Sequence, residues 1–261
     1  MHDSIPLLIK KVKEKKELQG IADSVVQRVV EKELKGYDSA VVFSNSQEKT
    51  LIKSIRAKLR LEVGRFYNKH TSLKKRTQLL EEGNNNQLLH SHASTKERAA
   101  EYTMLKKVMS DLDPRSILDL GCGLNPIALA TPTITYYASD INEHDLALVQ
   151  DFFTVNKITG KTFVYDLLQI KDDLPSADLC LLLKVFDTIE KKGHKLAEKI
   201  ISLVPCPKLI VSFSTKTLSG KPMNHPQRGW IEQLCKRVGY GYTTFSTKNE
   251  LFYSIEKSTN R

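Results

Sequence analysis

The sequence predicts an α/β protein in which a basic, all-helical domain, residues 1–86, precedes a sheet-containing domain, residues 87–261. Apolar residues recur at helical spacing through residues 5–83, whereas short β-rich runs alternate with helical stretches after residue 115. The charge is equally uneven. The first hundred residues hold 20 basic and 12 acidic residues, out of 40 and 30 in the whole chain.

Several helices are expected in the first domain. Residues 22–36 and 72–83 each end at a glycine, which commonly terminates a helix. The helix between them has an apolar face of Leu51, Ile52, Ile55, Leu59, Val63 and Phe66. A neighbouring stripe on the same helix consists of Lys49, Lys53, Arg56 and Arg60.

The stretch from Lys49 to Arg76 contains ten basic residues and one acid, Glu62. Ordinary surface helices mix both signs, because opposite charges three or four residues apart attract each other. The stretch therefore favours a surface that binds a polyanion, with a simple solvated helix as the alternative. If that polyanion is RNA, the candidate RNA-binding residues, the last two after the apolar run 208–214, are Lys53, Arg56, Arg60, Lys74, Lys75, Arg76, Lys216 and Lys221.

The β-rich runs predict a parallel sheet covered by helices on both faces. The five runs expected to be parallel are 116–121, 135–141, 162–166, 177–184 and 208–214. Residues 241–246 and 251–256 flank a Thr-Lys-Asn turn and predict a closing hairpin. Five such units closed by a hairpin resemble the Rossmann-like, seven-stranded fold of class I S-adenosylmethionine-dependent methyltransferases.

The sequence LDLGCGLNP, residues 118–126, places Asp119, Gly121 and Gly123 at the end of the first strand. Open α/β sheets bind ligands at the carboxyl ends of their strands, where glycine lets the backbone approach the ligand. A dinucleotide fingerprint needs a third glycine where Pro126 stands, and the Gly-Lys-Ser/Thr of a P-loop is missing. The turn therefore indicates a ligand other than a dinucleotide or a nucleoside triphosphate.

Acidic residues also end the next two strands. Asp140, next to Ile141, is suited to accept hydrogen bonds from both ribose hydroxyls, and Asp166 from an adenine amino group that Leu167 covers. Any one aspartate can instead cap a helix. Three of them at consecutive strand ends, Asp119 included, describe adenosine without phosphates, which is the adenosine of S-adenosylmethionine.

A helix is expected over residues 94–112, with Ser94 as its N-cap and Glu97 completing a capping box. Arg98 lies in its first turn, and a guanidinium group binds a carboxylate well. We hypothesise that Arg98 binds the methionine carboxylate of the cofactor. An ion pair on the helix surface is the alternative.

Four stretches together resemble the aminoglycoside-resistance 16S ribosomal RNA methyltransferases of the Arm/Rmt type, which modify guanine N7 in the decoding site. These stretches are LHSHASTKERAAEY, ILDLGCGLNPIALA, LLLKVFDTIE and VSFSTKTLSGK, and the resemblance is strongest from His92 to Leu129. The resemblance implies S-adenosyl-L-methionine as cofactor and the small ribosomal subunit as partner. It also implies cofactor contacts by Arg98, Gly123, Asp140, Asp166 and Leu167, and a functional lysine, Lys184, at the end of the fourth strand.

Guanine N7 carries a lone pair, so its methylation needs no general base and depends on proximity and electrostatics. We expect Lys184 to be a catalytic residue that contacts the target base or phosphate; the alternative is a lysine that only extends from the sheet end. Trp230 and Phe186 are candidates for stacking on the base, with core packing as the alternative.

Two other functions stay open. The first is methylation of another RNA, such as transfer RNA, or of another base atom. The second is a ribosome assembly or RNA-binding factor that binds the cofactor without turnover. A methyltransferase for small molecules would have no use for the basic excess.

We expect a monomeric, cytoplasmic protein with neither a metal site nor disulfides. The N-terminus lacks the pattern of a secretory signal, and no apolar run approaches the ~20 residues of a membrane span. The cysteines form no CxxC pair and are expected to be core thiols. They are Cys122, Cys180, Cys206 and Cys235.

Overall fold

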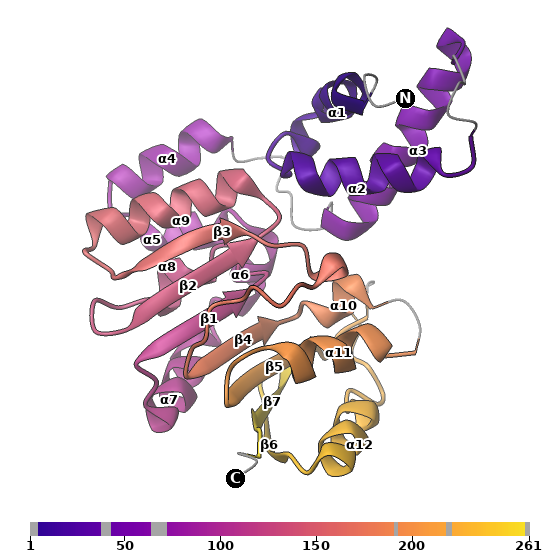
Figure 1. Ribbon diagram of the computed structural model, residues 1–261. Helices are drawn as coiled ribbons and strands as arrows, with labels where there is room; N and C mark the ends of the chain where they lie inside the picture. The colour runs from indigo at the N-terminus through magenta and orange to yellow at the C-terminus, as the bar shows by residue number, and fades with distance from the viewer. Residues whose placement is uncertain (1–4, 38–42, 64–71, 191–192, 218–220, 259–261) are drawn as a thin grey trace.

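The computed structural model describes residues 5–37, 43–63, 72–190, 193–217 and 221–258. In Figure 1, helices α1–α3 lie at one end of the molecule, and a sheet with helices on both faces makes up the rest. The helices of the first group are α1 (Ile5–Lys13), the 3-10 helix η2 (Lys16–Leu18), α2 (Asp23–Leu34) and α3 (Asn45–Val63). A helical part therefore precedes an α/β part, as the sequence predicts.

A core of its own holds the helical part together. Val25, Val29 and Leu34 of α2 share a buried cluster with Ile55 and Leu59 of α3. Removing these apolar side chains from water is the main force that packs the helices. The predicted apolar face of α3 is confirmed from Leu51 to Leu59; the side chain of Val63, and Phe66, lie outside the described residues.

Two further helices, α4 (Leu73–Glu81) and α5 (Asn85–His90), precede the sheet in the sequence. Leu79 and Leu88 belong to the same buried cluster as Ile117 in the sheet, and α4 packs against a helix of the α/β part. The change from one core to the other thus lies between α3 and α4, earlier than the predicted boundary at residue 86. We propose that the first folding unit ends before α4.

The sheet has seven strands in the order β3-β2-β1-β4-β5-β7-β6, with β7 antiparallel to both of its neighbours. The strands are β1 (Ser116–Leu120), β2 (Thr135–Asp140), β3 (Gly160–Val164), β4 (Leu179–Leu183), β5 (Lys208–Ser214), β6 (Gly241–Ser246) and β7 (Glu250–Glu256). Five parallel strands and a closing hairpin confirm the predicted fold class. In the register, Leu118 of β1 lies between Tyr137 of β2 and Cys180 of β4.

Helices cover both faces of the sheet, and each face has its own buried cluster. The helices after α5 are α6 (Ala93–Arg98), α7 (Tyr102–Leu112), α8 (Asn125–Leu129), α9 (Glu143–Val155), η3 (Leu167–Gln169), α10 (Phe186–Ile189), α11 (Lys195–Leu203) and α12 (Gly229–Val238). The chain leaves β1 toward β2 and β3, then crosses back to β4 and β5 on the other side. Such a switch opens a crevice at the carboxyl ends of β1 and β4. In the described part of the chain, no helix is long and apolar enough to cross a membrane.

The prediction of one continuous helix over residues 94–112 is wrong, because two helices, α6 and α7, occupy this segment. The N-cap of α6 is His92, and the Ser94 hydroxyl contacts the His92 ring instead of capping the helix. Glu97 does not complete a capping box either, since its carboxylate accepts a hydrogen bond from Lys184. Contacts to distant residues have overridden the local capping preference here.

Candidate functional site

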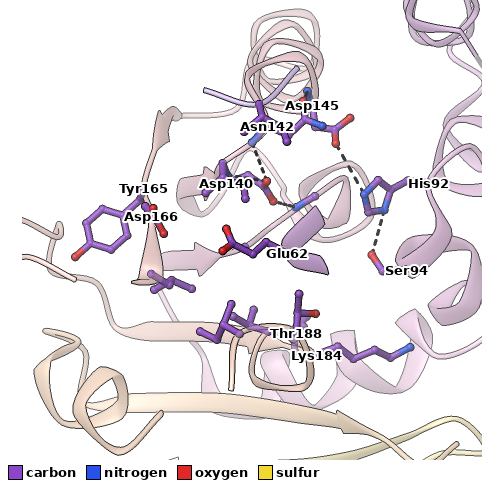
Figure 2. A pocket seen from close by; sticks show the side chains of 18 of the residues that line it. Glu62, His92, Ser94, Asp140, Asn142, Asp145, Tyr165, Asp166, Lys184 and Thr188 are labelled. Atoms are coloured by element: carbon purple, nitrogen blue, oxygen red, sulfur yellow. Dashed lines mark hydrogen bonds and ion pairs between the residues drawn. The ribbon is translucent and has the colours of Figure 1, made fainter. Parts of the chain in front are cut away.

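A pocket lies at the carboxyl ends of β1, β2, β3 and β4, where the topology opens the crevice. Figure 2 shows its side chains, which come from the strand ends and from several helices, among them Glu62 of α3, Asp145 of α9 and Thr188 of α10. The predicted cofactor-binding and catalytic residues that line the pocket are Gly121, Gly123, Asp140, Ile141, Asp166, Leu167 and Lys184. The structure therefore brings together seven of the predicted cofactor-binding and catalytic residues from four strand ends.

The glycine turn after β1 forms one side of the pocket. Gly121 and Gly123 have φ values of 71° and 49°, a left-handed conformation that residues with a side chain rarely adopt. A Cβ atom on Gly121 would lie 2.9 Å from Cγ2 of Val185, and one on Gly123 would lie 3.0 Å from Cε1 of His92. A side chain at either position would therefore crowd Val185 or His92, which explains why glycine stands at both.

Three backbone amides hold the Asp140 carboxylate. Oδ2 accepts a hydrogen bond from the Gly123 amide at 2.9 Å, and Oδ1 accepts from Ile141 and Asn142 at 2.7 and 3.0 Å. Burial raises the pKa of Asp140, and these amides act in the opposite direction. Oδ2 retains a lone pair for a ligand hydroxyl.

Asp166 caps the short helix η3 and also meets a guanidinium from the helical part. Oδ1 accepts from the Leu168 amide at 2.9 Å, and Oδ2 accepts from Nε of Arg28 at 2.5 Å. Leu167 beside it is buried. The capping alternative considered for a single aspartate is therefore correct for Asp166, although its carboxylate still lines the pocket.

Asp119 does not line the pocket, although the sequence placed it among the cofactor contacts. Its side chain is wholly buried and accepts a hydrogen bond from the Tyr136 hydroxyl at 2.9 Å. Oδ1 has no hydrogen-bond partner among the described residues, and burial raises the pKa of Asp119 to about 7. The two-residue alternation of a strand directs this carboxylate into the protein interior.

Arg98 is also placed outside the pocket lining, against the hypothesis that it binds the cofactor carboxylate. Nε and Nη2 donate to the two carboxylate oxygens of Glu250 at 2.8 and 2.6 Å, and Nη1 donates to Asn125 at 2.7 Å. Both charged side chains are fully buried, so the alternative of a surface ion pair is wrong as well. A buried guanidinium needs such a paired carboxylate, and Glu250 lies 152 residues away in the sequence.

Lys184 follows β4 with a φ of 60°, and its side chain is mostly buried at the pocket. Nζ donates to Oε2 of Glu97 at 2.9 Å, while its backbone amide is bound to Ser212. The Glu97 side chain is 66% exposed, whereas that of Lys184 is 8% exposed. Lys184 is therefore a mostly buried residue of the pocket whose Nζ atom is paired with an exposed carboxylate, that of Glu97.

Arg76, predicted to bind RNA, is instead a buried residue that lines the pocket. Nη1 donates to Oδ1 of Asp145 at 2.5 Å, and Nη2 donates to the Ser91 carbonyl. His92 lies between Asp145 and Ser94 in Figure 2, and its Nε2 is 3.8 Å from Asp145 Oδ2. Burial lowers the pKa of His92 to about 4, so the ring is neutral at pH 7. His92 and Asp145 were not predicted as site residues; the motif around His92 was their only signal.

The other predicted RNA-binding residues fall into three kinds. Arg56 and Arg60 join helices of the helical part, the first through the Val12 carbonyl and the second through Glu17. Lys216 is half-buried. Apart from the paired Arg60, the exposed members of the predicted set are Lys53, Lys74, Lys75 and Lys221.

The aromatic candidates pack within the protein. Trp230 stacks on His194, with ring centroids 4.6 Å apart, and Phe186 is 2% exposed. The core-packing alternative therefore describes both. All four cysteines are buried and free, and a search of the described residues finds no group of three metal-binding side chains.

The amino-acid sequence matches a known family along most of its length. The profile of this family, described as "Ribosomal RNA methyltransferase (FmrO)", aligns with residues 15–254. A relative from Serratia marcescens is 33% identical over 165 residues, which are 62% of this chain and 65% of the relative. One from Micromonospora echinospora is 30% identical over 177 residues, 64% of this chain and 63% of that one. Both are named 16S rRNA (guanine(1405)-N(7))-methyltransferase, and the chain spans somewhat less than two thirds of their length.

Solved structures share the fold of the whole chain. The 16S rRNA methylase RmtB superposes with a TM-score of 0.78 at 23% identity, covering 97% of this chain and 98% of its own. RmtF, solved in complex with S-adenosyl-L-homocysteine, gives 0.76 at 23% identity over 99% and 100% of the two chains. These similarities support the Rossmann-like methyltransferase fold. Because the family profile spans nearly the entire sequence, the protein belongs to the FmrO family of ribosomal RNA methyltransferases.

Proposed function

We propose that the protein is an S-adenosylmethionine-dependent methyltransferase that modifies guanine N7 of 16S ribosomal RNA at the decoding site. One observation carries the proposal: the glycine turn, Asp140, Asp166 and Leu167 line a single pocket at three successive strand ends. The names of the relatives supply the target base and atom.

The residues present fit the adenosine part of this cofactor. The lone pair left on Asp140 Oδ2 is suited to a ribose hydroxyl, and the left-handed glycine turn gives a ligand close access to the backbone. Ile141 and Leu167 supply apolar surface for the adenine ring, and Asp166 supplies an acceptor for its amino group. Asp119 and Arg98 lie outside the pocket lining, so they stabilise the surrounding fold and do not contact the cofactor.

The proposed reaction requires no general acid or general base from the protein. The cofactor supplies an electrophilic methyl group, and the N7 lone pair of guanine attacks it without losing a proton. The protein must therefore orient the base in line with the methyl group and exclude water. We assign Lys184 a catalytic role: once released by Glu97, its ammonium group donates to the target base or its phosphate.

RNA contacts are assigned to the exposed lysines of the predicted set, Lys53, Lys74, Lys75 and Lys221. Arg56, Arg60 and Arg76 hold the protein together instead. We further propose that the enzyme acts as a monomer in the cytoplasm, with the assembled small subunit as its partner. Size-exclusion chromatography with light scattering tests the monomer.

The test is transfer of a labelled methyl group to assembled small subunits, deproteinised ribosomal RNA and bulk transfer RNA. The product is mapped by N7-specific strand scission. Scission at one decoding-site guanine in intact subunits supports the proposal and predicts aminoglycoside resistance in cells that produce the protein. Label in transfer RNA, or incorporation without N7 scission, would contradict the substrate, and cofactor binding without any transfer would favour an assembly factor.

A further inference from the structure

We propose that Arg28 is a positioning residue of the cofactor site, which orients the Asp166 carboxylate toward the adenine amino group. Through Arg28, the helical part α1–α3 becomes a wall of the adenine pocket rather than only a surface for RNA. The inference rests on the proposed cofactor and extends it to residues far from the strand ends.

An ion-pair chain joins three elements at this place. Nε of Arg28, on α2, donates to Asp166 Oδ2 at 2.5 Å, and Nη2 donates to Glu62 Oε2, on α3, at 2.7 Å. The three side chains are only 13%, 14% and 12% exposed. One guanidinium therefore binds a strand-end carboxylate and a helix carboxylate at once, largely shielded from water.

These contacts define the direction of the Asp166 carboxylate. Its two oxygens are held by separate donors, the Leu168 amide on Oδ1 and Arg28, from the helical part, on Oδ2. Each carboxylate oxygen accepts two hydrogen bonds, so lone pairs remain for a ligand amino group. With the plane of the group held in advance, the ligand does not have to order it on binding.

Glu62 holds Arg28 in turn. Burial alone would lower the pKa of Arg28, but the Glu62 and Asp166 carboxylates raise it, so the guanidinium stays charged. Without it, two shielded carboxylates would lie near the adenine site with no cation between them. Both Glu62 and Asp166 line the same pocket.

The helical part also reaches the ribose side of the pocket. The Gly20 carbonyl accepts from the Glu143 amide at 2.7 Å, and the Ala22 amide donates to the Ile141 carbonyl at 2.9 Å. A Cβ atom on Gly20 would lie 2.4 Å from Oδ1 of Asn142, so the two segments are in close contact. The helical part is therefore fixed against both strand ends that contact adenosine.

Two ligands that differ at one position test the proposal. S-Adenosylhomocysteine carries the 6-amino group, whereas S-inosylhomocysteine carries a carbonyl oxygen there, so that its 6-position cannot donate to Asp166. Their dissociation constants are measured by calorimetry with the full-length protein and with Arg28→Ala. Because hydrogen bonds to charged groups contribute more than neutral ones, we expect Arg28→Ala to weaken the adenine ligand about tenfold or more, and the inosine ligand less than about threefold.

Two further variants complete the experiment. Arg28→Lys keeps the charge but cannot bridge both carboxylates, so it should restore part of the affinity for the adenine ligand. Lys58→Ala is the matched control, because Lys58 pairs with Glu33 across the same two helices without reaching the pocket. We expect this control to leave both dissociation constants unchanged.

Each outcome decides a separate question. Wild-type protein that binds neither ligand would overturn the cofactor assignment, and this inference with it. Wild-type binding that Arg28→Ala leaves unaltered would overturn the role of Arg28 alone. Equal weakening of both ligands by Arg28→Ala, or equal weakening by Lys58→Ala, would show a purely structural ion pair and also overturn it.

Discussion

Two arginines of this protein pair with carboxylates far away in the sequence, but in different surroundings. Arg98 and Glu250 are fully buried inside the α/β part, where Asn125 completes the contacts of the guanidinium. Arg28 and Asp166, 13% and 14% exposed, join the helical part to the edge of the pocket. The Arg98–Glu250 pair therefore lies inside the α/β part, whereas the Arg28–Asp166 pair connects the helical part with the α/β part.

This difference separates residues that hold the fold from residues that shape the site. A fully buried pair tolerates no loss of either partner, because the remaining charge would have no compensation. A pair at the edge of a pocket can instead hold a ligand-binding group in its orientation before the ligand arrives. The same residue type in two regions therefore predicts opposite patterns of stability and binding.

Substitution of Arg98 should give the largest effect on stability. Arg98→Ala leaves Glu250 buried without its partner, and removal of one member of a buried pair costs about 3–5 kcal/mol of unfolding free energy. Urea denaturation measures the loss. The control is Arg237→Ala, whose exposed pair with Glu198 should contribute about 0–1 kcal/mol. Equal losses in the two variants would remove the distinction between the buried and the exposed pair.

Asp119 should make the stability of the α/β core depend on pH. Burial raises the folded-state pKa of Asp119 to about 7, above the ordinary value of 3.8. The contribution of Asp119 to the unfolding free energy is complete below pH 3.8, where the carboxyl group is neutral in both states. It is lost as the pH rises toward 7, at up to roughly 1.4 kcal/mol per pH unit. Asp119→Asn keeps the neutral form at every pH. Relative to wild type, its unfolding free energy should rise between pH 4 and pH 8; a constant difference would contradict the assignment.

Asp140 should matter for binding rather than for folding. Asp140→Ala removes a charged acceptor for the ribose, and we expect the affinity for S-adenosylhomocysteine to fall by about 2 kcal/mol, or roughly thirtyfold. Calorimetry measures the affinity, and thermal unfolding of the unliganded variant is the control. If Asp140→Ala unfolds at a much lower temperature without ligand, the carboxylate belongs with Arg98 among the structural groups.

The exposed lysines should give the smallest effect. Lys74→Ala with Lys75→Ala should lower the slope of log affinity for ribosomal RNA against log salt by about 0.7–0.9 for each phosphate that the variant no longer neutralises. Filter binding at several salt concentrations gives the slope. An unchanged slope would remove α4 from the RNA surface.

Local features of the sequence predicted the strand ends well. The positions of Gly121 and Gly123 follow from backbone conformation, and Asp140 and Asp166 follow from their place after apolar strands. The same reasoning predicted all seven strands and the closing hairpin. In each case the determining interactions lie within a few residues in the chain.

The arginines could not be assigned in this way. Arg98, Arg76 and Arg28 each depend on a carboxylate that lies 152, 69 or 138 residues away, and no local pattern links the partners. Arg98 and Arg76 were therefore given ligands outside the protein, while Arg28 was overlooked. Asp119 was misplaced for another reason, since the sequence shows that a strand ends but not which side of the sheet a residue faces.

Hydrogen–deuterium exchange with and without S-adenosylhomocysteine tests most directly whether two parts of the chain form one pocket. We predict that the ligand slows exchange both at the strand ends, in residues 121–124 and 166–168, and in the segments of α2 and α3 that carry Arg28 and Glu62. Slower exchange at the strand ends alone, with α2 and α3 unchanged, would contradict the account.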